Sequence, residues 1–150
     1  MTKRFWLLLA LCLASLAVVV TPVAAGKAPH KAKKHEAPIY LSSGYTCSGG
    51  ASDTSGKTYG TFKAKLQSKG SMVDAEVKLK GADPSSTYGI YINQDPGGCP
   101  TTQVASLTTD KHGNGHVHLH VSHVAGATVA WASAVDSSQV LRSTAVKLSK

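Results

Sequence analysis

Apolar and polar positions alternate strictly in one stretch of the chain, Gly115–Ser122. Three apolar residues alternate there with three histidines: Val117, Leu119 and Val121 against His116, His118 and His120. Successive side chains of a β-strand point to opposite faces, so this pattern predicts a strand with an apolar face toward the core. The histidines, which we call the histidine stripe, should line its outer face. We expect a central strand, entered through a turn at Asp110–Gly115 that the Asp110 side chain fixes.

Similar patterns recur along the rest of the chain. The clearest is Met72–Lys80, which places its apolar residues inward and Asp74, Glu76 and Lys78 outward. The Ser68–Ser71 turn should join it to the preceding strand as a hairpin. Further strands are expected at residues 39–47, 59–66, 88–93, 104–109, 125–135 and 140–148.

Seven to eight strands at intervals of about 8 to 15 residues, separated by turns, are typical of an antiparallel sandwich. No stretch has a clear 3.6-residue period with helix caps. The sequence therefore predicts an all-β fold, an antiparallel Greek-key β-sandwich of immunoglobulin-like type, over residues 39–150. Trp131, flanked by Val129 and Ala132, is expected in the core.

The first 25 residues have the pattern of a cleaved signal peptide. Lys3 and Arg4 precede an apolar run over residues 5–20, and Val23-Ala24-Ala25 supplies small residues before a cut at Gly26. The alternative is an uncleaved membrane anchor. We expect a secreted or extracytoplasmic protein, in the periplasm or at the cell surface, with no transmembrane span after cleavage.

Residues 26–38 contain almost no large apolar side chains and are predicted to be a flexible basic linker. Four lysines give it its charge: Lys27, Lys31, Lys33 and Lys34. Without Lys3 and Arg4 the chain keeps fourteen basic and eight acidic residues, a net charge of +6. Possible partners are an anionic cell-surface polymer or another protein, and nothing indicates a specific nucleic-acid site. The alternative is a solvated spacer.

Cleavage would remove Cys12 and leave Cys47 and Cys99. Two cysteines in an exported chain most often form a disulfide, and two free thiols are the alternative. A bridge closing a loop of about 50 residues would stabilise the fold by roughly 4 kcal/mol in the chain-entropy model.

The histidine stripe carries the main candidate chemistry. Same-face neighbours lie about 6.6–7 Å apart on a strand, so His116 with His118, or His118 with His120, could share one ion. A third ligand would come from a neighbouring strand, from His112 or His123, or from a second molecule. Imidazole suits copper, zinc or nickel, and copper or zinc is the cofactor that the stripe could bind, although the pattern does not require one. The alternative is an exposed polar face without a ligand, whose histidines gain charge in mild acid.

Two segments, Val77–Asn93 and Leu107–Gly115, resemble strands and turns of the copper-zinc superoxide dismutase family. The resemblance implies a Greek-key sandwich. In that family the copper-binding strand carries two histidines, and here Tyr91 and Asn93 match those positions. The resemblance therefore implies the fold without the dismutase metal ligands, and no catalytic residues are predicted.

Together these patterns predict a secreted, non-catalytic binding or surface module with a basic tail and a histidine-rich face. The alternative is an extracytoplasmic copper- or zinc-binding protein that uses the histidine stripe.

Overall fold

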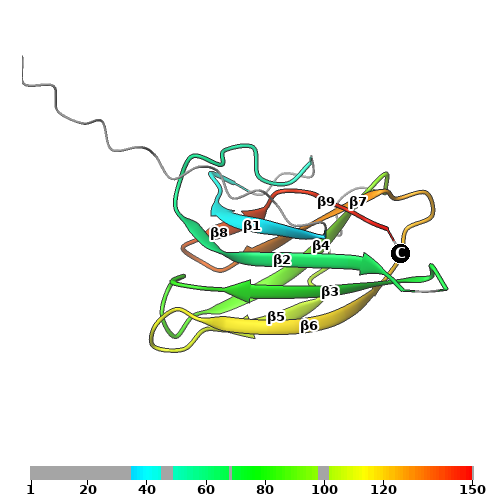
Figure 1. Cartoon of the computed structure of the whole chain (residues 1–150). Coiled ribbons are helices and arrows are strands. Elements are labelled where there is room, and N and C mark those ends of the chain that lie inside the picture. The colour runs from blue at the N-terminus through cyan, green and yellow to red at the C-terminus, as the bar shows by residue number, and fades with distance from the viewer. Residues whose placement is uncertain (1–34, 45–48, 68, 98–101, 150) are drawn as a thin grey trace, which may run out of the picture. The chain divides into compact units, whose positions relative to one another are not determined.

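The computed structural model of the chain describes residues 35–44, 49–67, 69–97 and 102–149 (Figure 1). These residues form β-strands joined by turns and contain no helix, so none could cross a membrane as a helix. The strands are β1 (Glu36–Leu41), β2 (Thr58–Leu66), β3 (Met72–Leu79), β4 (Thr87–Asp95), β5 (Ala105–Thr108), β6 (Gly115–Ser122), β7 (Val129–Val135), β8 (Val140–Ser143) and β9 (Val146–Lys147).

All strand pairs are antiparallel, which confirms the predicted all-β antiparallel class. The hydrogen-bonded order is β5-β4-β7-β8-β1-β2-β3-β6, and β9 pairs with β7. Strand β1 bonds to both β2 and β8, so the strands form one continuous sheet rather than two clearly separate ones. The antiparallel all-β arrangement is therefore confirmed, but the structure is not clearly a sandwich of two sheets.

The two ends of this strand order, β5 and β6, are consecutive in the chain and nearly close the sheet into a barrel (Figure 1). The Asp110 side chain holds the connecting turn, as predicted: its Oδ1 accepts hydrogen bonds from the backbone N–H groups of His112 and Asn114, at 2.7 and 2.9 Å. The two strands approach closely at Gly115, because a Cβ there would overlap the Leu107 side chain unless that side chain moved. The described residues of β5 and β6 therefore pack against each other here, although they do not pair.

The inward faces of the strands form the core. The alternation predicted for β3 is confirmed, since Val73, Ala75 and Val77 are fully buried and Leu79 nearly so. Phe62 of β2 is also fully buried. Each apolar side chain of this kind contributes roughly 1.5–3 kcal/mol when it leaves water. The outward residues of β2 and β3 stay accessible and form the face described below.

The prediction of a central position for the histidine strand is wrong. Strand β6 ends the strand order and, among the described strands, pairs only with β3. Its inward residues Val117, Leu119 and Val121 are partly buried, because no described strand pairs with β6 on its second side. Alternation within a strand shows which side chains share a face, but it does not show how many strands pair with it.

The first strand begins at Glu36, inside the stretch predicted to be linker. Ala37 is fully buried and Ile39 is 2% exposed, so both side chains face the core. Residues 36–38 are therefore part of the sheet. The signal-peptide region and all four tail lysines lie outside the described residues, as do Cys47 and Cys99, and the disulfide stays a prediction.

Trp131 is buried, as expected, with 1% of its surface exposed. It lies opposite Asn93 in the β4–β7 pair, and Asn93 donates a hydrogen bond to the hydroxyl of Ser133 at 3.4 Å. Trp131 and Ser133 alternate along β7 with Ala130, Ala132 and Ala134, which belong to the main core. The side chains of Trp131, Asn93 and Ser133 are therefore buried on the opposite face of β4 and β7.

Candidate metal site

The outer face of β2, β3 and β6 carries charged and imidazole side chains in three parallel rows. Strand pairing sets their register: Asp74 lies opposite His120, Glu76 opposite His118, and Lys78 opposite His116. Directly opposed and diagonal side chains on one sheet face are within reach of each other. The β3–β6 pairing therefore places a carboxylate row beside the histidine stripe.

Asp74, His118 and His120 form a group that could hold a metal ion. Each offers one ligand atom, and these atoms all lie within 4.8 Å of one another. His118 Nε2 is hydrogen-bonded to Asp74 Oδ1, and His120 Nδ1 lies 3.7 Å from the same oxygen. The two imidazole rings meet edge to face with centroids 5.1 Å apart. We call Asp74, His118 and His120 the metal group.

The donor spacing fits a first-row transition metal with small side-chain movements. Bonds of about 2.0–2.1 Å in a tetrahedral site place donor atoms about 3.3–3.4 Å apart. The 3.7 Å separation of His120 Nδ1 from Asp74 Oδ1 is already near this value. His118 Nε2 and Asp74 are closer than this, so an ion would replace the proton between them and push them apart. Both histidine side chains are about half exposed and can move in this way: 52% for His118 and 49% for His120.

Gln67, directly after β2, contacts His120 beside the metal group. Its amide Nε2 lies 3.1 Å from His120 Nδ1. An imidazole nitrogen has only one lone pair, so a metal ion bound at Nδ1 would replace the contact with Gln67. His120 Nδ1 must be unprotonated to act as a metal ligand.

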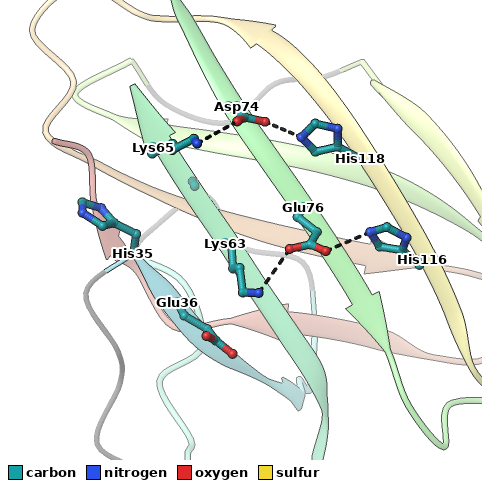
Figure 2. Close-up of a pocket in the computed structure, with 9 residues that line it drawn as sticks. His35, Glu36, Lys63, Lys65, Asp74, Glu76, His116 and His118 are labelled. Carbon is teal, nitrogen blue, oxygen red and sulfur yellow. Dashed lines mark hydrogen bonds and ion pairs between the residues drawn. The ribbon is translucent and has the colours of Figure 1, made fainter. Parts of the chain in front are cut away.

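Asp74 is held as a carboxylate. Burial would raise its pKa, but the hydrogen bond and charge of His118, together with those of Lys65, outweigh burial and lower the pKa below its ordinary value. Lys65 Nζ lies 3.4 Å from Asp74 Oδ2, the oxygen that His118 does not contact (Figure 2). A negatively charged Asp74 is the form that binds a cation.

Glu76 forms a separate cluster on the same face. Its carboxylate lies 2.9 Å from Lys78 Nζ, 3.0 Å from His116 Nε2 and 3.3 Å from Lys63 Nζ. The hydrogen bond from Lys78 outweighs burial and, together with Lys63, lowers the pKa of Glu76 to about 2. His116 is thereby directed to Glu76 rather than to the metal group (Figure 2).

A shallow groove of about 590 Å³ runs along this face. It is bordered by residues of β2, β3 and β6 and by the start of β1 (Figure 2). Asp74 and His118 of the metal group lie on its wall. The remaining polar residues that line it are His35, Glu36, Lys63, Lys65, Glu76 and His116.

The structure thus brings together two of the five predicted metal-site histidines, His118 and His120. His116 contacts Glu76, and His112 lies in the turn before β6, outside the metal group. Both ring nitrogens of His123 already contact backbone carbonyl oxygens, those of Gly70 at 2.9 Å and Ala127 at 3.0 Å.

Asp74 is the candidate ligand that was not identified from the sequence. A third ligand was expected from a neighbouring strand, among other sources, and this carboxylate lies in such a position. The alternation of Met72–Lys80 predicted that Asp74 points outward, but it did not predict that β3 pairs with β6. The sequence did contain an indication of this pairing. Two of its alternating segments have complementary outer faces, one with acidic and one with imidazole side chains.

No protein-family model, curated protein or solved structure matches the chain. The candidate metal site is therefore supported by its own residues alone, and the resemblance to the dismutase family stays a prediction.

Proposed function

We propose that this protein is an exported, non-catalytic binding module whose outer β3–β6 face binds Cu²⁺ or Zn²⁺. The observation that carries the proposal is the convergence of Asp74, His118 and His120, with ligand atoms within 4.8 Å of one another. Two imidazoles and one carboxylate are a donor set that suits both ions, and copper binds more tightly than zinc to a given set of this kind.

The position of the metal group favours binding over catalysis. Catalytic metal sites act in shaped cavities from which water is excluded, where the electrostatic effect of the ion is strong. Here the imidazoles are half exposed on a sheet face beside an open groove. Exposed ligands lose conformational freedom on binding, so we expect modest affinity and exchangeable metal.

We also propose the Greek-key architecture that the dismutase resemblance implies. Strand β3 pairs with β6, and β4 pairs with β7, so in both cases the chain forms two other strands before it returns beside the first. Returns of this kind are characteristic of a Greek key and support the proposal. By that resemblance, Tyr91 and Asn93 of β4 match positions that are histidines in that family. The proposed site is therefore a different one, built on β3 and β6.

The basic segment before β1 supports a second role, attachment to an anionic cell-surface polymer. Its four lysines and the net charge of +6 expected after cleavage favour acidic partners. Attachment of this kind would hold the metal-binding face at the cell surface.

Calorimetric titration of the tag-free purified protein with Zn²⁺ and Cu²⁺ tests the metal proposal. The decisive variant is the double substitution His118→Asn and His120→Asn. His116→Asn is the matched control, since it makes the same change on the same strand face outside the metal group. We expect saturable binding that the double variant loses and the control retains. Absent binding, or equal binding by all three proteins, would overturn the proposal.

A further inference from the structure

We propose that the metal ion and Lys65 together bind a small oxyanion, a carboxylate or a phosphate, in the groove beside the metal group. This inference rests on the metal-binding function proposed above and names a second ligand for the same site.

The metal group provides fewer ligands than a transition metal needs. Three side chains converge, and a tetrahedral ion takes one more ligand. Asp74 and His118 form part of the groove wall, so an ion held by them borders the groove. The remaining coordination position is therefore accessible to a small molecule that enters the groove.

The groove becomes positive when a divalent ion binds. Its lining carries Lys63 and Lys65 against Glu36, Asp74 and Glu76, which is a net charge of −1 with the histidines neutral. Lys78, which contacts Glu76 at 2.9 Å, brings this total to 0. Without metal, the groove therefore has no excess positive charge for an anion. A divalent ion adds two positive charges, so an anion should bind only after the metal.

Lys65 is the cation best placed to contact that anion. Its side chain is 64% exposed, and its ammonium lies 3.4 Å from Asp74 Oδ2. When Asp74 shares its charge with a metal ion, Lys65 is attracted less strongly to that carboxylate and can contact a second anion. An oxyanion that coordinates the metal through one oxygen has a further oxygen for this contact.

Lys63 lies in the same groove but is paired with Glu76, not with the metal group. It lies 3.3 Å from Glu76, which is outside the metal group, and opposite Glu36 in the β1–β2 pair. Metal binding leaves both of these carboxylates in place. Lys63 is therefore the matched control for Lys65.

Cobalt provides the test, because the visible spectrum of bound Co²⁺ changes with its coordination. The Co²⁺-loaded protein is titrated with acetate and, in a separate arm, with inorganic phosphate, which distinguishes a carboxylate from a phosphate ligand. We expect a saturable spectral change with at least one anion and no binding of that anion to the metal-free protein. Lys65→Gln should weaken anion binding about two- to fivefold, the range of an exposed ion pair, while Lys63→Gln leaves it unchanged.

The outcomes separate this inference from the proposed function. Bound Co²⁺ whose spectrum neither anion changes would overturn the oxyanion site and leave metal binding intact. Equal weakening by both lysine substitutions would overturn the assignment to Lys65. If Co²⁺ does not bind, the metal function fails and the oxyanion site fails with it.

Discussion

Replacement of Glu76 by Gln removes the carboxylate at the centre of the charged cluster on β3. Glu76 is 23% exposed and contacts Lys63, Lys78 and His116 at 2.9–3.3 Å. A glutamine of the same shape keeps the strand and its packing. The substitution therefore isolates the electrostatic contribution of this carboxylate to stability.

The size of the effect follows from the pKa of Glu76, which falls from 4.5 to about 2 in the folded protein. A shift of one unit corresponds to about 1.36 kcal/mol, so the contribution is at most about 3 kcal/mol. The side chains of Lys63 and Lys78 are about half exposed, so solvent screens their charges. We therefore expect a loss of about 1–2 kcal/mol in the free energy of unfolding at neutral pH.

The sign of the pH dependence follows from the direction of the shift. A carboxylate with a lowered pKa stabilises the fold fully above its unfolded value of 4.5, and this stabilisation is lost as the pH falls through about 2. Urea unfolding should show the full difference between wild type and Glu76→Gln at about pH 7 and less than half of it at about pH 3.

Glu36→Gln serves as the control for this experiment. Glu36 lies on the neighbouring strand β1 and forms no ion pair within the part of the chain that the structure describes. Its substitution should change stability little at either pH. A Glu76→Gln loss of the same size at both pH values would refute the electrostatic reasoning and indicate a packing effect.

Three further predictions concern the turn, a buried hydroxyl and the metal. Gly113→Ala should destabilise the protein by about 1 kcal/mol or more in urea unfolding, because Gly113 has φ +75° and a Cβ would overlap the Ala82 carbonyl, whereas Gly56→Ala meets no neighbouring atom and should be nearly neutral. Tyr88→Phe should cost about 1 kcal/mol, since its hydroxyl donates to Gln139 Oε1 at 2.8 Å. Burial raises the pKa of Tyr88 to about 12, so in an alkaline absorbance titration one tyrosine should ionise late. Calorimetry should show weaker Zn²⁺ binding at about pH 5.5 than at about pH 7.5, because protons compete for the imidazole nitrogens, and equal affinity would contradict histidine coordination.

Strand positions could be predicted well from the sequence because they depend on local alternation. The segments around Met72–Lys80 and Gly115–Ser122 form strands at nearly the predicted residues, and their inward and outward faces are as expected. Both patterns extend over at least four alternations, which leaves little ambiguity in period. Glu36–Pro38 was missed as part of a strand because its only apolar contribution to the core is one alanine.

Strand neighbours could not be predicted, and the candidate site depends on them. Nothing local to Asp74 indicates that it lies beside His118, since 44 residues separate the two. Their contact follows from the pairing of β3 with β6, which brings the chain back over two intervening strands. The position of β6 at the end of the sheet has the same origin. In both cases, long-range pairing decides a property that alternation leaves open.

The pairing of β1 with both β2 and β8 has a consequence for how this protein folds. Strand β1 is made early, yet Ile39–Leu41 pair with Leu141–Ser143, about a hundred residues later. The sheet can become continuous only when nearly the whole chain is available. Long-range pairing of this kind slows folding, because the cost of closing a large loop precedes the gain from contacts. A chain released before Val140 would leave β1 and part of β7 as unpaired edges, which are prone to pair with other chains and aggregate.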